Sequence, residues 1–224
     1  MIASMPLAGF GLVTLCHFLP PPSPNMTALD VAGLYQTNTG MKRMGFMLMM
    51  LAGGFQWSFT AAISVHMRRI EGPARMLTYT QLAVGSANGV LTLIPSLFFT
   101  VAAFRPDRNP DVTMALHDLA WITTTMPVAS FMLQQFVIAM AVFADKATRP
   151  VFPRWVAYMN IWTALLYLPA FGETFFKTGP FAWNGLLAFW IAVAAFMGWT
   201  ISMLVMLFKA IRSQEAEAAL APAR

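Results

Sequence analysis

Residues 77–104 read LTYTQLAVGSANGVLTLIPSLFFTVAAF, a run without a single Asp, Glu, Lys or Arg. A helix needs about 20 mostly apolar residues to cross the hydrocarbon core of a bilayer. This run is long enough, and its apolar residues do not alternate with polar ones as they do in the strands of an outer-membrane barrel. The stretch therefore predicts a transmembrane helix.

Five further stretches of the chain have the same apolar character. The six predicted spans are residues 2–20, 44–66, 77–104, 118–144, 155–172 and 184–210. Lipid offers no hydrogen-bond partner, so each span must satisfy its own backbone groups as a helix. The predicted fold is an all-α polytopic integral membrane protein, a bundle of six transmembrane helices in one domain (1–212), followed by a short tail (213–224).

Composition excludes most other classes of protein. Of the 224 residues, 58% are hydrophobic and 10% are charged, and the mean hydropathy is +0.62. A soluble domain carries about 25% charged residues. The net charge of +5 would suggest nucleic acid in a soluble protein, but here the basic residues lie in short loops, where they set topology and meet anionic lipid. The expected partners are membrane lipids and no nucleic acid, and the lone Cys16 predicts a buried thiol without an internal disulfide.

The distribution of Lys and Arg predicts the orientation, because cytoplasmic loops carry the excess of both. With the N-terminus inside, the cytoplasmic segments hold nine basic residues: Arg68, Arg69, Arg75, Lys146, Arg149, Arg154, Lys209, Arg212 and Arg224. The outer segments hold five: Lys42, Arg43, Arg105, Arg108 and Lys177. Both termini are therefore expected in the cytoplasm, in a multi-pass protein of a plasma or inner membrane.

The first span has an alternative interpretation as a cleaved signal peptide. It begins without a basic segment and shows no small-x-small cleavage site before the Pro-rich stretch that ends at Pro24. A retained helix is therefore preferred. After it, Thr27-x-x-Asp30 resembles a capping box and predicts a short helix on the outer surface.

Three of the predicted spans contain an internal proline, at Pro95, Pro127 and Pro169. Each proline removes a backbone donor and pushes on the preceding turn, so each helix should bend there. All three fall in the outer half of the membrane in the orientation above. Bent outer halves would leave a cavity open to the outside, although prolines in membrane helices also serve packing alone.

Uncharged amide side chains lie inside four spans. They are Gln56, Gln81, Asn88, Gln134, Gln135 and Asn160. An amide in hydrocarbon needs partners, so these side chains should face the bundle interior and bind one another across helices. The sharper hypothesis is that Gln56, Asn88, Gln134, Gln135 and Asn160 contact the polar group of a ligand.

The ionisable residues that could perform chemistry gather, by topology, at the outer mouth. His17 ends the first span, His117 and Asp118 open the fourth, and Glu173 follows the fifth. A carboxylate beside an imidazole could form an acid/base pair, which makes these four the candidate catalytic residues. No His-x-x-x-His or Glu-x-x-His spacing is present, so neither a metal nor a cofactor is expected. The competing interpretation is structural, since Asp118 near a helix N-terminus suits the helix dipole.

Three functions remain open from the sequence. The first is binding or passage of a small, largely apolar molecule through an outward-facing intramembrane pocket. The second is a structural or accessory subunit of a larger membrane complex, and the third is a membrane-embedded enzyme acting on a lipid, sterol or isoprenoid. Ion-coupled transport is disfavoured, because no charged residue lies near the middle of a predicted span. A second copy of the chain or the subunits of a complex would be the protein partners.

Overall fold

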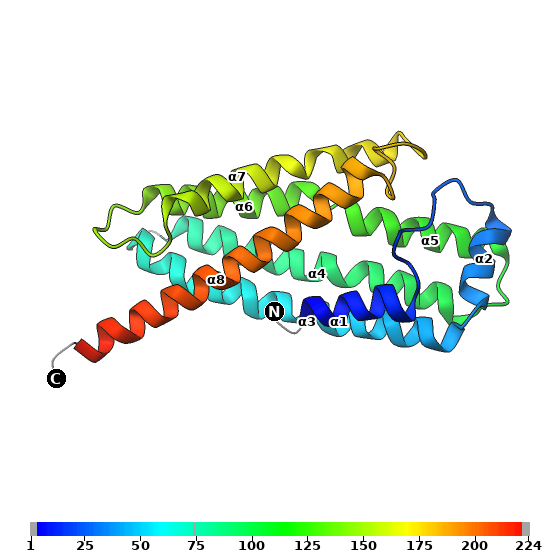
Figure 1. Ribbon diagram of the computed structural model, residues 1–224, viewed down its shortest axis with the longest axis horizontal. Coiled ribbons are helices and arrows are strands. Elements are labelled where there is room, and N and C mark those ends of the chain that lie inside the picture. Colours follow the sequence, from blue (N-terminus) through cyan, green and yellow to red (C-terminus); the bar gives the residue numbers. More distant parts are fainter. Residues whose placement is uncertain (1–3, 74, 221–224) are drawn as a thin grey trace.

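The computed structural model describes residues 4–73 and 75–220, and within them the chain is helical without strands (Figure 1). The all-helical class predicted from the sequence is thus confirmed. The elements are α1 (Ser4–Gly9), the π-helix η1 (Phe10–Leu15), α2 (Ala28–Gln36), α3 (Thr39–Glu71), α4 (Met76–Phe104), α5 (Pro110–Thr125), α6 (Val128–Ala144), α7 (Arg154–Leu166), the 3-10 helix η2 (Leu168–Thr174), the π-helix η3 (Leu186–Trp190) and α8 (Ile191–Leu220).

Four of the helical stretches are long and apolar enough to cross a membrane. They are Thr39–Glu71, Met76–Phe104, Pro110–Ala144 and Leu186–Ala216. Two predicted spans are shorter as helices: the first ends as a helix at Leu15, and the fifth is an α-helix only over Arg154–Leu166. The described part of the chain is therefore all-helical and contains four helices compatible with crossing a membrane.

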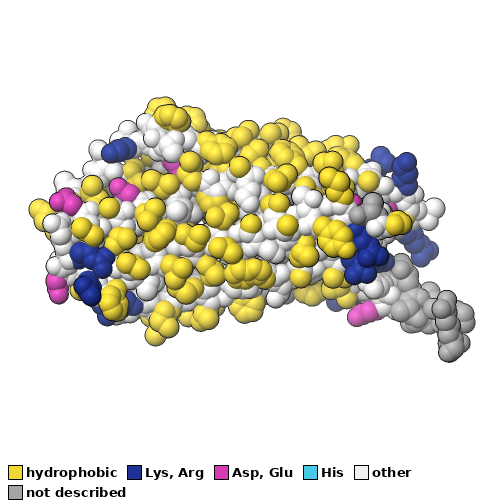
Figure 2. Space-filling model, turned by 180° about the vertical axis from the view of Figure 1, so that it is seen from behind, with side chains coloured by type: hydrophobic (Ala, Val, Ile, Leu, Met, Phe, Trp, Pro, Cys, Tyr) yellow, Lys and Arg dark blue, Asp and Glu magenta, His cyan; other side chains and the backbone are white. Residues whose placement is uncertain are grey.

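The long helices run side by side along one axis, which gives the bundle two distinct ends (Figure 1). We call one the α2 end, where α2 lies across the helices beside the connections 105–109 and 175–185. We call the other the basic end, where Gly72, Pro73, the loop 145–153 and the C-terminal part of α8 lie. Figure 2 shows a broad hydrophobic band between the ends, with Lys, Arg, Asp and Glu gathered at the ends. Such a band is what a lipid-facing surface requires.

The short helix predicted after the first span is confirmed as α2. Thr27 Oγ1 accepts a hydrogen bond from the Asp30 backbone N–H (3.2 Å), and the Thr27 N–H donates to the Asp30 carboxylate (3.1 Å). The two residues thus form the capping box, which satisfies the first donors of the helix. The hydrogen bonds from Thr27 hold the pKa of Asp30 below its ordinary value.

Two buried clusters form most of the core. Toward the basic end, α3, α6, α7 and α8 bury aliphatic residues around Phe59, Met67 and Trp199. Toward the α2 end, Phe18 and Trp121 lie at the centre of an aromatic cluster. The first segment is held against α3 by a close backbone contact, because a Cβ at Gly45 would come within 2.4 Å of Cys16 Sγ.

Candidate ligand pocket at the helix breaks

The helix formed by α5 and α6 is interrupted at Met126 and Pro127. The α-helical pattern stops at Thr125, and the Met126 N–H still reaches the Ile122 carbonyl (2.9 Å) before α6 resumes at Val128. Proline lacks the N–H that would continue the ladder, and its ring pushes on the preceding turn. The helix is therefore interrupted at Pro127, a position where the sequence predicts a bend.

A second interruption lies at Pro169. Helix α7 stops at Leu166, and Leu168–Thr174 follows as the 3-10 helix η2, with Pro169 at its start. By contrast, α4 continues as an α-helix through the buried Pro95. Two of the three prolines thus coincide with a change in helix type.

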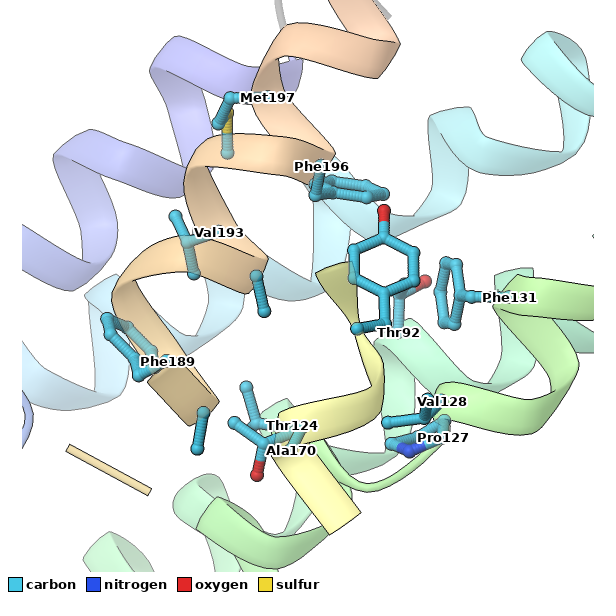
Figure 3. Close-up of a pocket in the computed structure, with 14 residues that line it drawn as sticks. Thr92, Thr124, Pro127, Val128, Phe131, Ala170, Phe189, Val193, Phe196 and Met197 are labelled. Carbon is cyan, nitrogen blue, oxygen red and sulfur yellow. The ribbon is translucent and has the colours of Figure 1, made fainter. Parts of the chain in front are cut away.

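A cavity of about 230 Å³ lies between these two interruptions and the start of α8 (Figure 3). Its walls come from α4, from the α5–α6 break, from α7–η2 and from η3–α8. They comprise Thr92, Thr124, Thr125, Pro127, Val128, Phe131, Tyr167, Ala170, Ala188, Phe189, Ala192, Val193, Phe196 and Met197. In Figure 3 the side chains of Phe131, Val128 and Pro127 lie on one side and those of Val193 and Met197 on another, with the space between them.

The walls are almost entirely apolar, because the threonine hydroxyls are bound to backbone. Thr92 Oγ1 donates to the Gly89 carbonyl (2.8 Å) and Thr124 Oγ1 to the Ala120 carbonyl (2.7 Å). Such back-bonding removes the hydroxyl proton from use by a ligand. The cavity therefore suits hydrocarbon more than a strongly polar molecule.

Tyr167 is the polar exception in the wall. Its hydroxyl lies 3.2 Å from Gln135 Nε2, while Gln135 Oε1 has no hydrogen-bond partner among the described residues. In this orientation the Gln135 NH₂ donates to the Tyr167 hydroxyl, which leaves the Tyr167 proton without an acceptor. If the amide were rotated by 180°, Tyr167 would donate to Gln135 Oε1 and the NH₂ would be without a partner. In the orientation that the structure shows, the Tyr167 hydroxyl in the cavity wall keeps its proton for a ligand.

Glu173 adds a carboxyl group beside the cavity wall. It lies just beyond the fifth predicted span (155–172), is 7% exposed and accepts a hydrogen bond on Oε2 from Thr125 Oγ1. Its Oε1 has no partner among the described residues. Burial raises the pKa of Glu173 to about 7, against a smaller lowering effect of the Thr125 hydrogen bond.

The Thr125 hydroxyl gives an independent reason for a neutral Glu173. Thr125 Oγ1 lies within hydrogen-bond distance of both the Trp121 carbonyl (3.0 Å) and the Glu173 carboxyl group. One hydroxyl proton cannot fully satisfy two acceptors. A protonated Glu173 resolves the conflict, since it donates to Thr125, which then donates to Trp121.

The amide residues proposed as ligand contacts lie outside the cavity wall. Asn88 Nδ2 donates to Gln134 Oε1 across α4 and α6 (2.7 Å), and Asn160 Oδ1 accepts from Trp199 Nε1 (2.8 Å). Gln81, an amide that was not proposed as a ligand contact, accepts on its side-chain Oε1 from Ser64 Oγ. All these side chains are buried. The remaining members differ: Gln56 is buried with its Nε2 unpaired, whereas Gln135 reaches the cavity through Tyr167.

The four outer-mouth residues have different surroundings. His117 is buried among aromatic rings, with Nδ1 2.8 Å from the Tyr35 hydroxyl, whereas the side chain of His17 is exposed. Asp118 is half-buried on the same helix as His117. Among the described residues no three His, Cys, Asp or Glu side chains are grouped so as to hold a metal. Only Glu173, of the four, adjoins the cavity wall, through Thr125.

Sequence reasoning missed the aromatic walls of the pocket. Tyr167 precedes Leu168 and Pro169, so its position at a break was a usable signal. Phe189, Val193 and Phe196 gave none, because they lie in a run that is apolar on every face. Comparisons with family models, curated proteins and solved structures found no match for this chain.

Proposed function

We propose that this chain is an integral membrane protein that binds a small, largely apolar molecule in the cavity at the helix breaks. The observation that carries the proposal is the cavity itself, walled by Phe131, Val193 and Phe196 and supplied with a donor by the Tyr167–Gln135 pair. Ligand sites are mostly apolar with a few placed polar groups. Irregular helix turns also occur frequently at functional sites, and η3 contributes Ala188 and Phe189 to the wall.

The size of the cavity restricts the ligand. Pockets for drug-sized molecules usually measure about 300–1,000 Å³, and this one measures about 230 Å³. The fitting ligand is therefore either smaller than a drug molecule or inserts one part, such as the end of a chain. A single hydroxyl or carbonyl group on it would meet Tyr167 or Gln135.

We further propose six crossings, with both termini and the basic end in the cytoplasm. The support is the excess of Lys and Arg in the segments that the bundle brings to the basic end. The α2 end, and the half of the bundle that holds the cavity, would then face outward. Reporter fusions after Arg108 should read outside and fusions after Arg149 inside, and the reverse pattern would refute the orientation.

The binding proposal is tested by filling the cavity. Ala192 lies in the cavity wall, whereas Ala194 on the same helix is exposed. Ala192→Phe should abolish a small apolar molecule that co-purifies with the wild-type protein, whereas the control Ala194→Phe should retain it. Extraction followed by mass spectrometry measures the amount per chain. Equal retention in both variants, or no such molecule on the wild type, would refute the proposal, and a stoichiometric protein partner would favour the accessory-subunit alternative.

Glu173 favours a second candidate function, an enzyme acting on an apolar substrate. A buried carboxyl group whose pKa lies near 7 suits a general acid or base. Glu173→Gln keeps the shape of the side chain and removes its titration. An enzyme would bind its ligand and fail to turn it over in this variant, whereas a binding protein would retain its full function.

A further inference from the structure

A second cavity, of about 280 Å³, lies at the basic end, far along the bundle from the first. Three elements supply a cation to it: Arg69 from α3, Arg149 from the loop 145–153, and Lys209 from α8. The side chains of Val151, Trp155 and Met206 line the same space. This cavity therefore combines positive charge with apolar surface, unlike the pocket at the helix breaks.

None of the residues that line this cavity is acidic. Arg149 and Lys209, two of its three cations, form no ion pair with a described carboxylate. Asp145, the carboxylate of the loop 145–153, is bound to backbone, because it accepts from the N–H groups of Ala147 (3.0 Å) and Val151 (2.9 Å). An anion from outside the chain is thus the natural partner.

The start of α7 adds to the attraction for an anion. Pro153 precedes the first residue of α7 and Trp155 is its second residue, and both line the cavity. The N-terminus of a helix carries unpaired N–H groups and a partial positive charge, which favour phosphate. The dipole and the basic side chains therefore act in the same direction.

The position of this cavity relative to the hydrophobic band indicates the source of the phosphate. Trp155 is 47% exposed, and Trp is enriched where the membrane meets water. The basic groups lie at the end of the hydrophobic band (Figure 2), and Val151 and Met206 offer alkyl surface beside them. A phosphate group attached to a hydrocarbon chain would contact the basic side chains with its charge and the apolar side chains with its chain.

We propose that this cavity binds the phosphate group of an anionic phospholipid, with Arg149 and Lys209 as its principal cationic contacts. Basic pockets between transmembrane helices are known to hold lipid headgroups. The site is separate from the pocket at the helix breaks, so it stands whether or not that pocket binds a ligand. Free inorganic phosphate would present the same chemistry without the acyl chains.

The test uses the full-length protein in nanodiscs of mixed phosphatidylcholine and phosphatidylglycerol, with native mass spectrometry to count retained lipids. The wild type should retain phosphatidylglycerol in preference to phosphatidylcholine. Replacing both cations, Arg149→Gln with Lys209→Gln, should lower that retention by about thirtyfold, at roughly 1 kcal/mol for each charge near a lipid surface. The matched control, Lys146→Gln with Arg154→Gln, removes two charges at the same end from residues that do not line the cavity.

Each outcome is decisive. Equal losses in the test and control pairs would show a general surface attraction and overturn the site. Displacement of phosphatidylglycerol by millimolar inorganic phosphate would refute a lipid as the bound molecule. Retention of phosphatidylglycerol in the presence of inorganic phosphate would support it. If the double variant fails to fold, the single variant Lys209→Gln, at an exposed residue, should lower retention by about fivefold. Unchanged retention in this variant would refute the proposal.

Discussion

The two halves of the bundle differ in the regularity of their helices. Toward the basic end, the helices α3, α4, α6 and α8 are uninterrupted and enclose a close-packed core around Met67 and Trp199. Toward the α2 end, the helices are irregular. The described chain there contains the π-helices η1 and η3, the 3-10 helix η2 and the break at Met126 and Pro127. The cavity at the helix breaks lies in this second half.

The difference shows how an apolar chain can place a cavity. Regular helices bring small residues into close contact, so side chains fill the space between them. A broken helix cannot keep its side chains in register with its neighbours, and aromatic groups such as Phe131 and Phe196 bridge the gap incompletely. Regular packing should therefore be sensitive to added volume, and the irregular half should be sensitive to charge.

The largest expected change in stability comes from adding a methyl group at Gly85, in the regular half. A Cβ there would lie 2.5 Å from Thr60 Cγ2 and 2.7 Å from Gln134 Nε2. Gly85→Ala should lower the free energy of unfolding by up to about 3 kcal/mol, because helices α3, α4 and α6 must move apart. Thermal unfolding in detergent measures the change. Gly54→Ala is the control, since nothing lies within 4 Å of its Cβ, and equal stability of the two variants would contradict the close packing.

The next effect concerns charge in the irregular half. The pKa of Glu173 is raised from an ordinary 4.5 to about 7, so between these values the folded state binds more protons than the unfolded state. Stability should therefore fall by about 2.5 kcal/mol as the pH rises from 4.5 to 7 and level off above that. Melting temperatures across this range should show the fall in the wild type and little of it in Glu173→Gln. A variant on the exposed Glu215, Glu215→Gln, should keep the fall, and an identical profile in Glu173→Gln would refute the assignment.

The smallest effect is the coupling between Asn88 and Gln134 in the regular half. Each amide loses its partner when the other becomes Leu, so the double variant should cost less than the sum of the two single ones. Double-mutant cycles for such bonds in membranes average about 0.6 kcal/mol. A coupling energy indistinguishable from zero would mean that the 2.7 Å contact contributes nothing to stability.

Much of the fold could be predicted from the sequence, because hydrocarbon tolerates few backbone solutions. The run 77–104 coincides with α4 to within one residue, and the capping box at Thr27 and Asp30 identified α2. The length of the first segment was wrong, since its helix ends at Leu15. There the residues 16–27 leave the helix to reach the α2 end, where Phe18 packs with rings from α2, α3, α4 and α5. Such tertiary contacts have no local signal.

The candidate site was predicted only in outline. Pro127 and Pro169 marked the breaks because proline acts on its own helix, whatever surrounds it. The wall residues of α8 could not be found, because every face of Ile191–Leu220 is apolar and periodicity cannot tell lipid-facing positions from cavity-facing ones. The ligand role of the amides stays a prediction.

The aromatic cluster around Phe18 has a consequence for biosynthesis. The first segment leaves the ribosome early, yet the Trp183 indole, which donates to the Pro22 carbonyl (2.8 Å), is 161 residues further along the chain. At about 5–20 residues per second, some 8–30 s pass before that partner is made. During this interval the Pro22 carbonyl lacks the indole that binds it in the folded protein. Trp183→Ala should therefore lower the stability of the folded protein, because Trp183 is buried, and leave the insertion of the first segment unchanged.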